Sequence, residues 1–174
     1  MQHEDLVSHI TQVTQDVFCT MLGQSTSVVQ VKMENGGTGE ACGVAALVGI
    51  AGGWQGTGII SCSSNLACKL ASQMLTTEYV SVNDDVLDAM GEIANIVVGN
   101  IKTNLEEKLG ILALSIPTVV HGKNFATRSL GKHDWTIVEF DCDGNHFLVQ
   151  MMLIENTKHA VTPRGGFAAL HRVS

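Results

Sequence analysis

The sequence is short of basic residues, with ten Lys and Arg against 17 Asp and Glu and a formal net charge of −7. No cluster of positive charge stands out along the chain. Proteins that bind nucleic acid or anionic membranes depend on such clusters. We therefore expect neither of these as a partner.

An apolar segment long enough to cross a bilayer is also lacking. The longest apolar stretch, residues 41–51, is interrupted by Gly and is about half of the roughly 20 residues that a spanning helix needs. The first residues, MQHEDLVSHI, have neither the basic start nor the apolar run of a signal peptide. These features lead us to expect a cytoplasmic protein.

Motifs for metal, phosphate and disulfide chemistry are missing as well. The five cysteines include no C-x-x-C pair, so we expect reduced and mostly buried thiols. The histidines fit neither H-x3-H nor H-E-x-x-H, and we expect no metal site in the chain. The Gly-rich segments "NGGTGEACG" and "AGGWQGTG" are not followed by Lys-Ser/Thr and a helix, which favours hairpin turns over a phosphate loop.

What is present is the composition of one folded domain. The 174 residues are 45% hydrophobic and 16% charged, which suits a single globular unit with a core of its own. Apolar periodicity predicts helices over residues 5–22, 65–76 and 83–109. Runs of β-forming residues predict strands over 27–33, 43–51, 54–62, 111–121, 135–142 and 145–154.

The order of these elements is a helix and three strands, a second helix, then a long helix and three strands. Strands in consecutive runs indicate an antiparallel sheet covered by helices, and thus an α+β fold. The order also suggests one unit used twice, an internal pseudo-repeat. Residues 155–174 contain turn signals without a clear pattern and are left unassigned.

The long helix has one apolar face and a second, polar stripe beside it. An arc of roughly 120° holds the residues expected to be buried, which are Leu87, Met90, Ala94, Val97, Val98, Ile101, Leu105 and Leu109. Asp88, Glu92, Asn95 and Gly99 follow one another at helical spacing next to that arc, and Ile96 lies at the margin of their stripe.

This polar stripe has two features that simple solvation does not require. Asp88 and Glu92 are like charges at i, i+4 with no Lys beside them, an arrangement that is mildly unfavourable in a helix. Gly in a helix lowers helix stability by about 1 kcal/mol relative to Ala. A Gly that is kept despite this cost, beside an exposed Ile, is typical of a docking surface. The alternative is an ordinary solvated face.

At these residues the sequence resembles the CheC/CheX/FliY phosphatase family. The pattern Asp88-x3-Glu92-x2-Asn95-x21-Pro117 reproduces the signature of that family. The segments "GEIANIVVGN", "SIPTVVHG" and "VFCTMLG" are similar to it too. The resemblance covers about residues 5 to 154 and is greatest to the CheX branch, whose members are dimeric and have a single site.

The resemblance implies a CheC-like fold and the hydrolysis of phosphoaspartate in a CheY-like receiver domain of a response regulator, as in chemotaxis and other two-component signalling. Glu92 would contact the active-site lysine of the receiver, and Asn95 would hold a water in line with the phosphoryl group. Asp88, Gly99 and Pro117 would support them. Mg²⁺ would belong to the receiver, with no cofactor in this chain.

A second site is not expected in the first helix. Alignment of its end, "TMLG", with the "KLG" that ends the long helix places Asp5 and Ser8 opposite Glu92 and Asn95. Ser in the place of Asn makes a working second site doubtful, so we expect one site per chain and, from the resemblance, a homodimer. The alternatives are a non-catalytic receiver-binding or scaffold module of the same fold, and a structural or small-ligand-binding dimer.

Overall fold

The computed structural model describes residues 3–36, 40–126 and 133–157. Three helices are α1 (His3–Leu22), α2 (Ser64–Leu75) and α3 (Asp84–Leu109). The strands are β1 (Ser27–Asn35), β2 (Glu40–Gly52), β3 (Trp54–Cys62), β4 (Leu112–Leu114), β5 (Thr118–Ala126), β6 (Asp134–Cys142) and β7 (Asn145–Glu155). The predicted helices are therefore confirmed. Most of the unassigned segment 155–174 lies outside the described residues.

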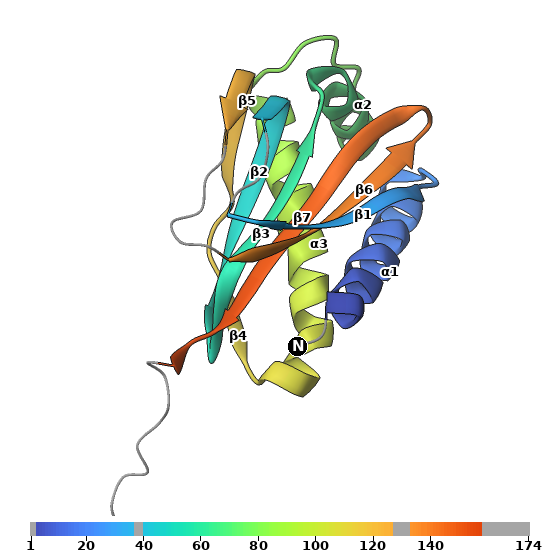
Figure 1. Cartoon of the computed structure of the whole chain (residues 1–174). Coiled ribbons are helices and arrows are strands. Elements are labelled where there is room, and N and C mark those ends of the chain that lie inside the picture. The colour runs from blue at the N-terminus through green and yellow to red at the C-terminus, as the bar shows by residue number, and fades with distance from the viewer. Residues whose placement is uncertain (1–2, 37–39, 127–132, 158–174) are drawn as a thin grey trace, which may run out of the picture.

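The strands form one antiparallel sheet in the order β1-β6-β7-β3-β2, with β4 and β5 both paired to β2. All three helices lie on one face of this sheet (Figure 1). The two halves of the chain exchange their first strands, because β1 pairs with β6 while β4 and β5 pair with β2. An antiparallel sheet covered by helices confirms the predicted α+β class, and a helix followed by strands occurs in both halves of the chain.

Sequence signals at the helix ends and hairpins explain where these elements begin and end. The side chain of Ser63 accepts a hydrogen bond from the backbone of Leu66 at the start of α2, and Asn83 does the same for Val86 at the start of α3. The hairpin between β6 and β7 turns at Asp143 and Gly144, both of which have positive φ.

The single strand predicted over 111–121 was wrong. Two strands replace it, and Pro117 lies between them. Proline has no backbone N–H to donate to a ladder, so the pairing with β2 is interrupted there. Leu112–Leu114 pairs with the end of β2, and the longer β5 pairs with its beginning. Residues 115–117 join the two strands, and we call residues 114–117, which include the last residue of β4, the connector.

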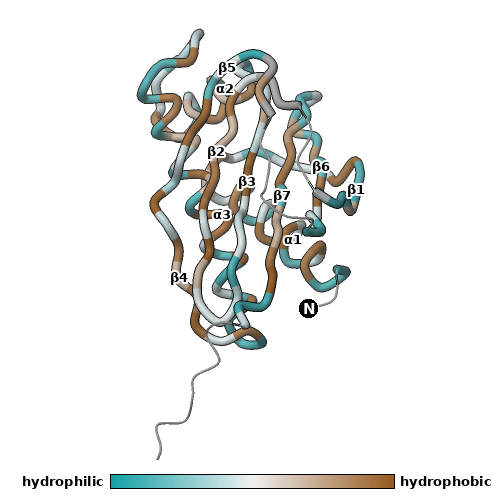
Figure 2. Tube along the Cα trace, turned by 60° about the vertical axis from the view of Figure 1, so that its left-hand side comes forward, coloured by the Kyte–Doolittle hydropathy of each residue, from teal (hydrophilic) through white to brown (hydrophobic). Residues whose placement is uncertain are grey.

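The core lies between the sheet and the helices, and α3 is its central element. This helix contacts α1 and α2 as well as β2, β3 and β5. Its buried face is therefore wider than the predicted arc and includes Ile93, which is fully buried. Leu87 and Leu109, which we predicted to be buried, are only half-buried at the two ends of the helix. In Figure 2 strand β2 is largely apolar, while α1 alternates between polar and apolar residues.

A carboxylate fixes the end of α3 to the first residue of β4. One oxygen of Glu106 accepts hydrogen bonds from the backbone N–H of Leu112 at 2.8 Å and from Lys102 Nζ at 2.9 Å. These two donors hold the pKa of the Glu106 carboxyl below its ordinary value of 4.5, the Leu112 bond contributing most. Because the folded-state pKa is lowered, the ionised carboxylate stabilises the fold above that value and loses this effect as the pH falls.

Glu106→Gln keeps an acceptor for Leu112 but removes the charge, so it should lower the melting temperature at pH 7 by a few degrees at most. The difference from wild type should shrink as the pH falls below 4.5. Thermal unfolding followed by circular dichroism from pH 7 to pH 3 measures this. Glu107→Gln, at an exposed position, is the matched control. An equal difference at both ends of the range would contradict the assignment.

Candidate active site on helix α3

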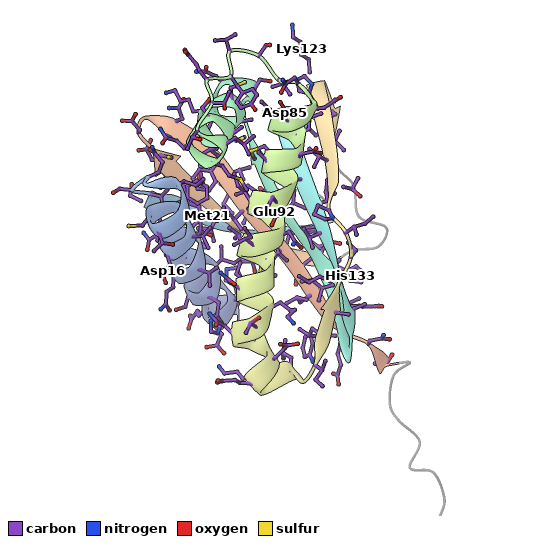
Figure 3. All side chains as sticks on the ribbon, turned by 180° about the vertical axis from the view of Figure 1, so that it is seen from behind. Asp16, Met21, Asp85, Glu92, Lys123 and His133 are labelled. Carbon is purple, nitrogen blue, oxygen red and sulfur yellow. The ribbon has the colours of Figure 1, made fainter. Side chains whose placement is uncertain are left out.

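The polar stripe predicted for the long helix lies on the outer side of α3. Asp88 and Glu92 are exposed, whereas Asn95, Ile96 and Gly99 are half-buried. Glu92 lies midway along the helix in the view from the helical face (Figure 3). The structure thus brings these five residues together within about three turns of one helix.

The side chains of this stripe are not used within the fold. Among the described residues, Asp88, Glu92 and Asn95 make no side-chain hydrogen bond or ion pair. The two lysines of α3 lie in its C-terminal half and are already paired, Lys102 with Glu106 and Lys108 with Asp5. The stripe therefore presents unneutralised carboxylates and a free carboxamide to a partner.

Pro117 is placed beside this stripe by a glycine of α3. A Cβ built on Gly91 would lie 3.5 Å from Pro117 Cβ, an ordinary contact, and 3.2 Å from Val119 Cγ2, a tight one, so the connector and β5 pack closely against the helix at this glycine. Gly99 plays a similar part, since its Cβ would lie 3.5 Å from Leu114 Cδ1. Pro117 is far from Asn95 in the sequence, but its packing at Gly91 places it about one turn of α3 from Asn95.

Gly91, Asn95 and Gly99 form one row on α3, because each is four residues from the next. The connector touches the helix at both ends of this row, through Pro117 at Gly91 and Leu114 at Gly99. It follows that the connector runs alongside Asn95. Sequence reasoning missed Gly91, although a glycine inside a helical pattern is a recognised sign of close packing.

The corresponding position on α1 differs. Asp5, which aligns with Glu92, accepts a hydrogen bond from Lys108 Nζ at 3.1 Å. Ser8, which aligns with Asn95, is exposed. A carboxylate already paired with a lysine of its own chain is less available to a partner, and the number of sites per chain stays a prediction.

The cysteine thiols, which are the other reactive groups considered, are less suited to catalysis. Cys62, Cys68 and Cys142 are buried and only Cys19 of the four described thiols is exposed. Burial raises the pKa of Cys62 to about 12, which leaves it an uncharged thiol at neutral pH.

No helix in the described part of the chain has the length and apolarity to cross a membrane.

A cavity of about 360 Å³ lies between α2 and the β6–β7 hairpin. Its lining mixes polar side chains, among them Gln24, Lys69 and Glu78, with apolar ones such as Leu66 and Leu70. The apolar pocket expected of a small-ligand-binding dimer would have a different lining. This cavity therefore gives no support to that alternative.

The chemistry open to the stripe follows from its functional groups. A carboxylate can bind a cation supplied by another molecule, and a carboxamide can orient a water because it donates and accepts hydrogen bonds without becoming charged. Reactions that need positioning and charge stabilisation more than a strong base fit this set, and phosphoryl transfer to water is one of them.

The chain is similar in sequence to known proteins. The family model for chemotaxis phosphatase CheX matches residues 44–141, a region that includes the stripe and Pro117. The CheY-P phosphatase CheX of Thermotoga maritima is 35% identical over 86 residues, which are 49% of this chain and 56% of that protein. The match therefore spans little more than half of that relative's length.

Solved structures show the same fold. The chemotaxis protein CheX of Desulfovibrio desulfuricans superposes with a TM-score of 0.78 at 22% identity, over 86% of this chain and 99% of the other. CheX of Borrelia burgdorferi, solved in complex with CheY, BeF3 and Mg²⁺, gives a TM-score of 0.69 at 26% identity over 86% and 97% of the two chains. With more than half of its residues matched by the family model, the chain belongs to the CheX family of chemotaxis phosphatases.

Proposed function

We propose that this chain hydrolyses the phosphoaspartate of a CheY-like receiver domain, with Glu92 and Asn95 as its catalytic residues. The observation that carries this proposal is the exposed stripe on α3, where a carboxylate and a carboxamide without partners of their own lie beside Pro117. The names of the Thermotoga and Borrelia proteins support a phosphorylated receiver as the substrate.

In the proposed reaction, the Asn95 carboxamide enters the receiver's site and orients a water in line with the phosphorus. The new bond joins the water oxygen to phosphorus, and the bond between phosphorus and the aspartate oxygen breaks. The aspartate leaves as a carboxylate, and the protons of the water pass to the released phosphate and the solvent. Positioning of this kind lowers the barrier without a change in the charge of Asn95.

Glu92 serves as the anchor in this proposal. Its exposed carboxylate has no cationic partner on α3, because both lysines of that helix are already paired. It would therefore pair with the lysine of the receiver. Asp88 adds to the negative potential that attracts that lysine. Gly99 and Pro117 shape the surface, and Ile96 adds an apolar contact at its margin. Mg²⁺ is expected on the receiver and no cofactor in this chain.

A homodimer in the cytoplasm completes the proposal. The outer strand β1 exposes Val28, Val29, Val31 and Met33, and apolar residues on an edge strand favour pairing with another copy. Light scattering at micromolar concentration should give twice the mass of the 18.5 kDa chain. A monomer mass under these conditions would contradict the dimer and leave the proposed chemistry untouched.

The proposed reaction is tested with receivers from the same genome. Each receiver is activated with beryllofluoride and Mg²⁺, and those retained by the immobilised chain are then phosphorylated and assayed for loss of phosphate. We expect at least one receiver to bind and to lose its phosphate faster with the chain than alone. Binding without acceleration would favour the non-catalytic receiver-binding module.

A further inference from the structure

An apolar side chain on the connector has no role in the fold. Ile116 is 86% exposed, although a large aliphatic residue gains stability when it is buried. It lies in the segment "SIPTVVHG", directly before Pro117. By contrast, Pro117 and Val119, which follow it in the chain, are half-buried and lie against Gly91.

The backbone around Ile116 is held firmly. Ser115 donates its N–H to the carbonyl of Gly49 at 2.9 Å, and its hydroxyl accepts a hydrogen bond from the N–H of Gly49 at 2.8 Å. The same hydroxyl donates to the carbonyl of Ile116 at 2.8 Å. A residue before proline is also restricted to extended conformations. Ile116 is therefore presented to solvent in a fixed position and loses little freedom when it is covered.

This position adjoins the catalytic stripe. The connector touches α3 at Gly91 and at the level of Gly99, and Asn95 lies midway between these two contacts. Ile116 directly precedes Pro117, which lies at Gly91, one turn of α3 before Asn95, so Ile116 is about one helical turn from Asn95 along the helix axis. A receiver domain is much wider than one helical turn, so a receiver that brings a phosphoryl group to Asn95 is expected to reach Ile116.

We propose that Ile116 is a specificity-determining residue that packs against an apolar patch beside the phosphorylation site of the receiver domain. The inference rests on the proposed function and names which surface of the partner is read. Glu92 selects a receiver with a cation at its site. Ile116 in addition requires an apolar patch on the receiver at a fixed distance from that cation. Because this contact is made equally before and during the reaction, it contributes to KM and leaves kcat unchanged.

The test is the kinetics of Ile116→Ser with a receiver that the wild type binds. We expect KM, and the dissociation constant for the beryllofluoride-activated receiver, to rise about tenfold, while kcat stays within about twofold. Ile116→Leu should restore most of the affinity. Since Ile116 is almost fully exposed, the melting temperature of both variants should match that of the wild type.

Ile111→Ser is the matched control, because Ile111 is 89% exposed and follows the end of α3, roughly 20 Å along the helix from Asn95. Its KM should equal that of the wild type. If Ile116→Ser also binds like the wild type, the inference is wrong while the proposed function stands. If the wild type binds a receiver without hydrolysing it, the proposed function fails and the dissociation constants still decide the role of Ile116. A wild type that binds no receiver would overturn both.

Discussion

Asn95→Ala is expected to lower kcat for receiver dephosphorylation by about 100-fold or more, the scale on which enzymes lose activity when one positioned catalytic group is removed. KM should change little, because Asn95 orients a water and is not the anchor. Ala is the better helix former, so the half-buried position on α3 should not lose stability. Steady-state kinetics with one phosphorylated receiver, together with thermal unfolding, measures both effects.

Asn104→Ala is the control for this variant. Asn104 is the same residue type on the same helix and is exposed, but lies more than two turns beyond Asn95. It should keep the wild-type kcat. A wild-type kcat in Asn95→Ala at saturating chain concentration would mean that Asn95 takes no part in the chemistry, and the receiver-binding module would then be the better description.

Glu92→Ala should differ, since it removes the group that meets the cation of the partner. We expect KM to rise and kcat to fall together, with a loss of about 2 kcal/mol, or roughly thirtyfold, in kcat/KM. Binding should also become less sensitive to ionic strength, because one pair of opposite charges is lost. Titration of the beryllofluoride-activated receiver at low and high salt separates the binding effect from the turnover effect.

Glu107→Ala controls for the loss of a negative charge from α3, because Glu107 is exposed near the C-terminal end of the helix, far from Glu92. Its affinity for the receiver should stay within about twofold of the wild type. If Glu107→Ala and Glu92→Ala weaken binding equally, the effect comes from net charge, and Glu92 is not an anchor.

Much of the fold follows from local signals in the sequence. The helices were predicted because their apolar spacing is regular and because Ser63, Asn83 and Gly110 mark their ends. Errors arose where distant segments decide the outcome. Leu87 is less buried than predicted because the cover of α3 by α1, α2 and the sheet cannot be read from a helical wheel. The division of the 111–121 strand depends on how both pieces pair with β2.

The polar stripe could be found from the sequence because all of its members lie on one helix. Its boundary could not, because the connector reaches α3 only through tertiary contacts with Gly91 and Gly99. The importance of Ser115 depends likewise on Gly49, which is 66 residues away in the chain. Side chains joined by such long-range contacts have no spacing that a sequence pattern can reveal.

The most direct measurement is the single-turnover rate of phosphate loss from a phosphorylated receiver that is saturated with the wild-type chain, in the presence of Mg²⁺ and water enriched in ¹⁸O. In-line attack on phosphorus predicts a rate well above that of the receiver alone, with ¹⁸O in the released phosphate and none in the aspartate carboxylate. A rate equal to that of the receiver alone, or label in the carboxylate, would contradict it.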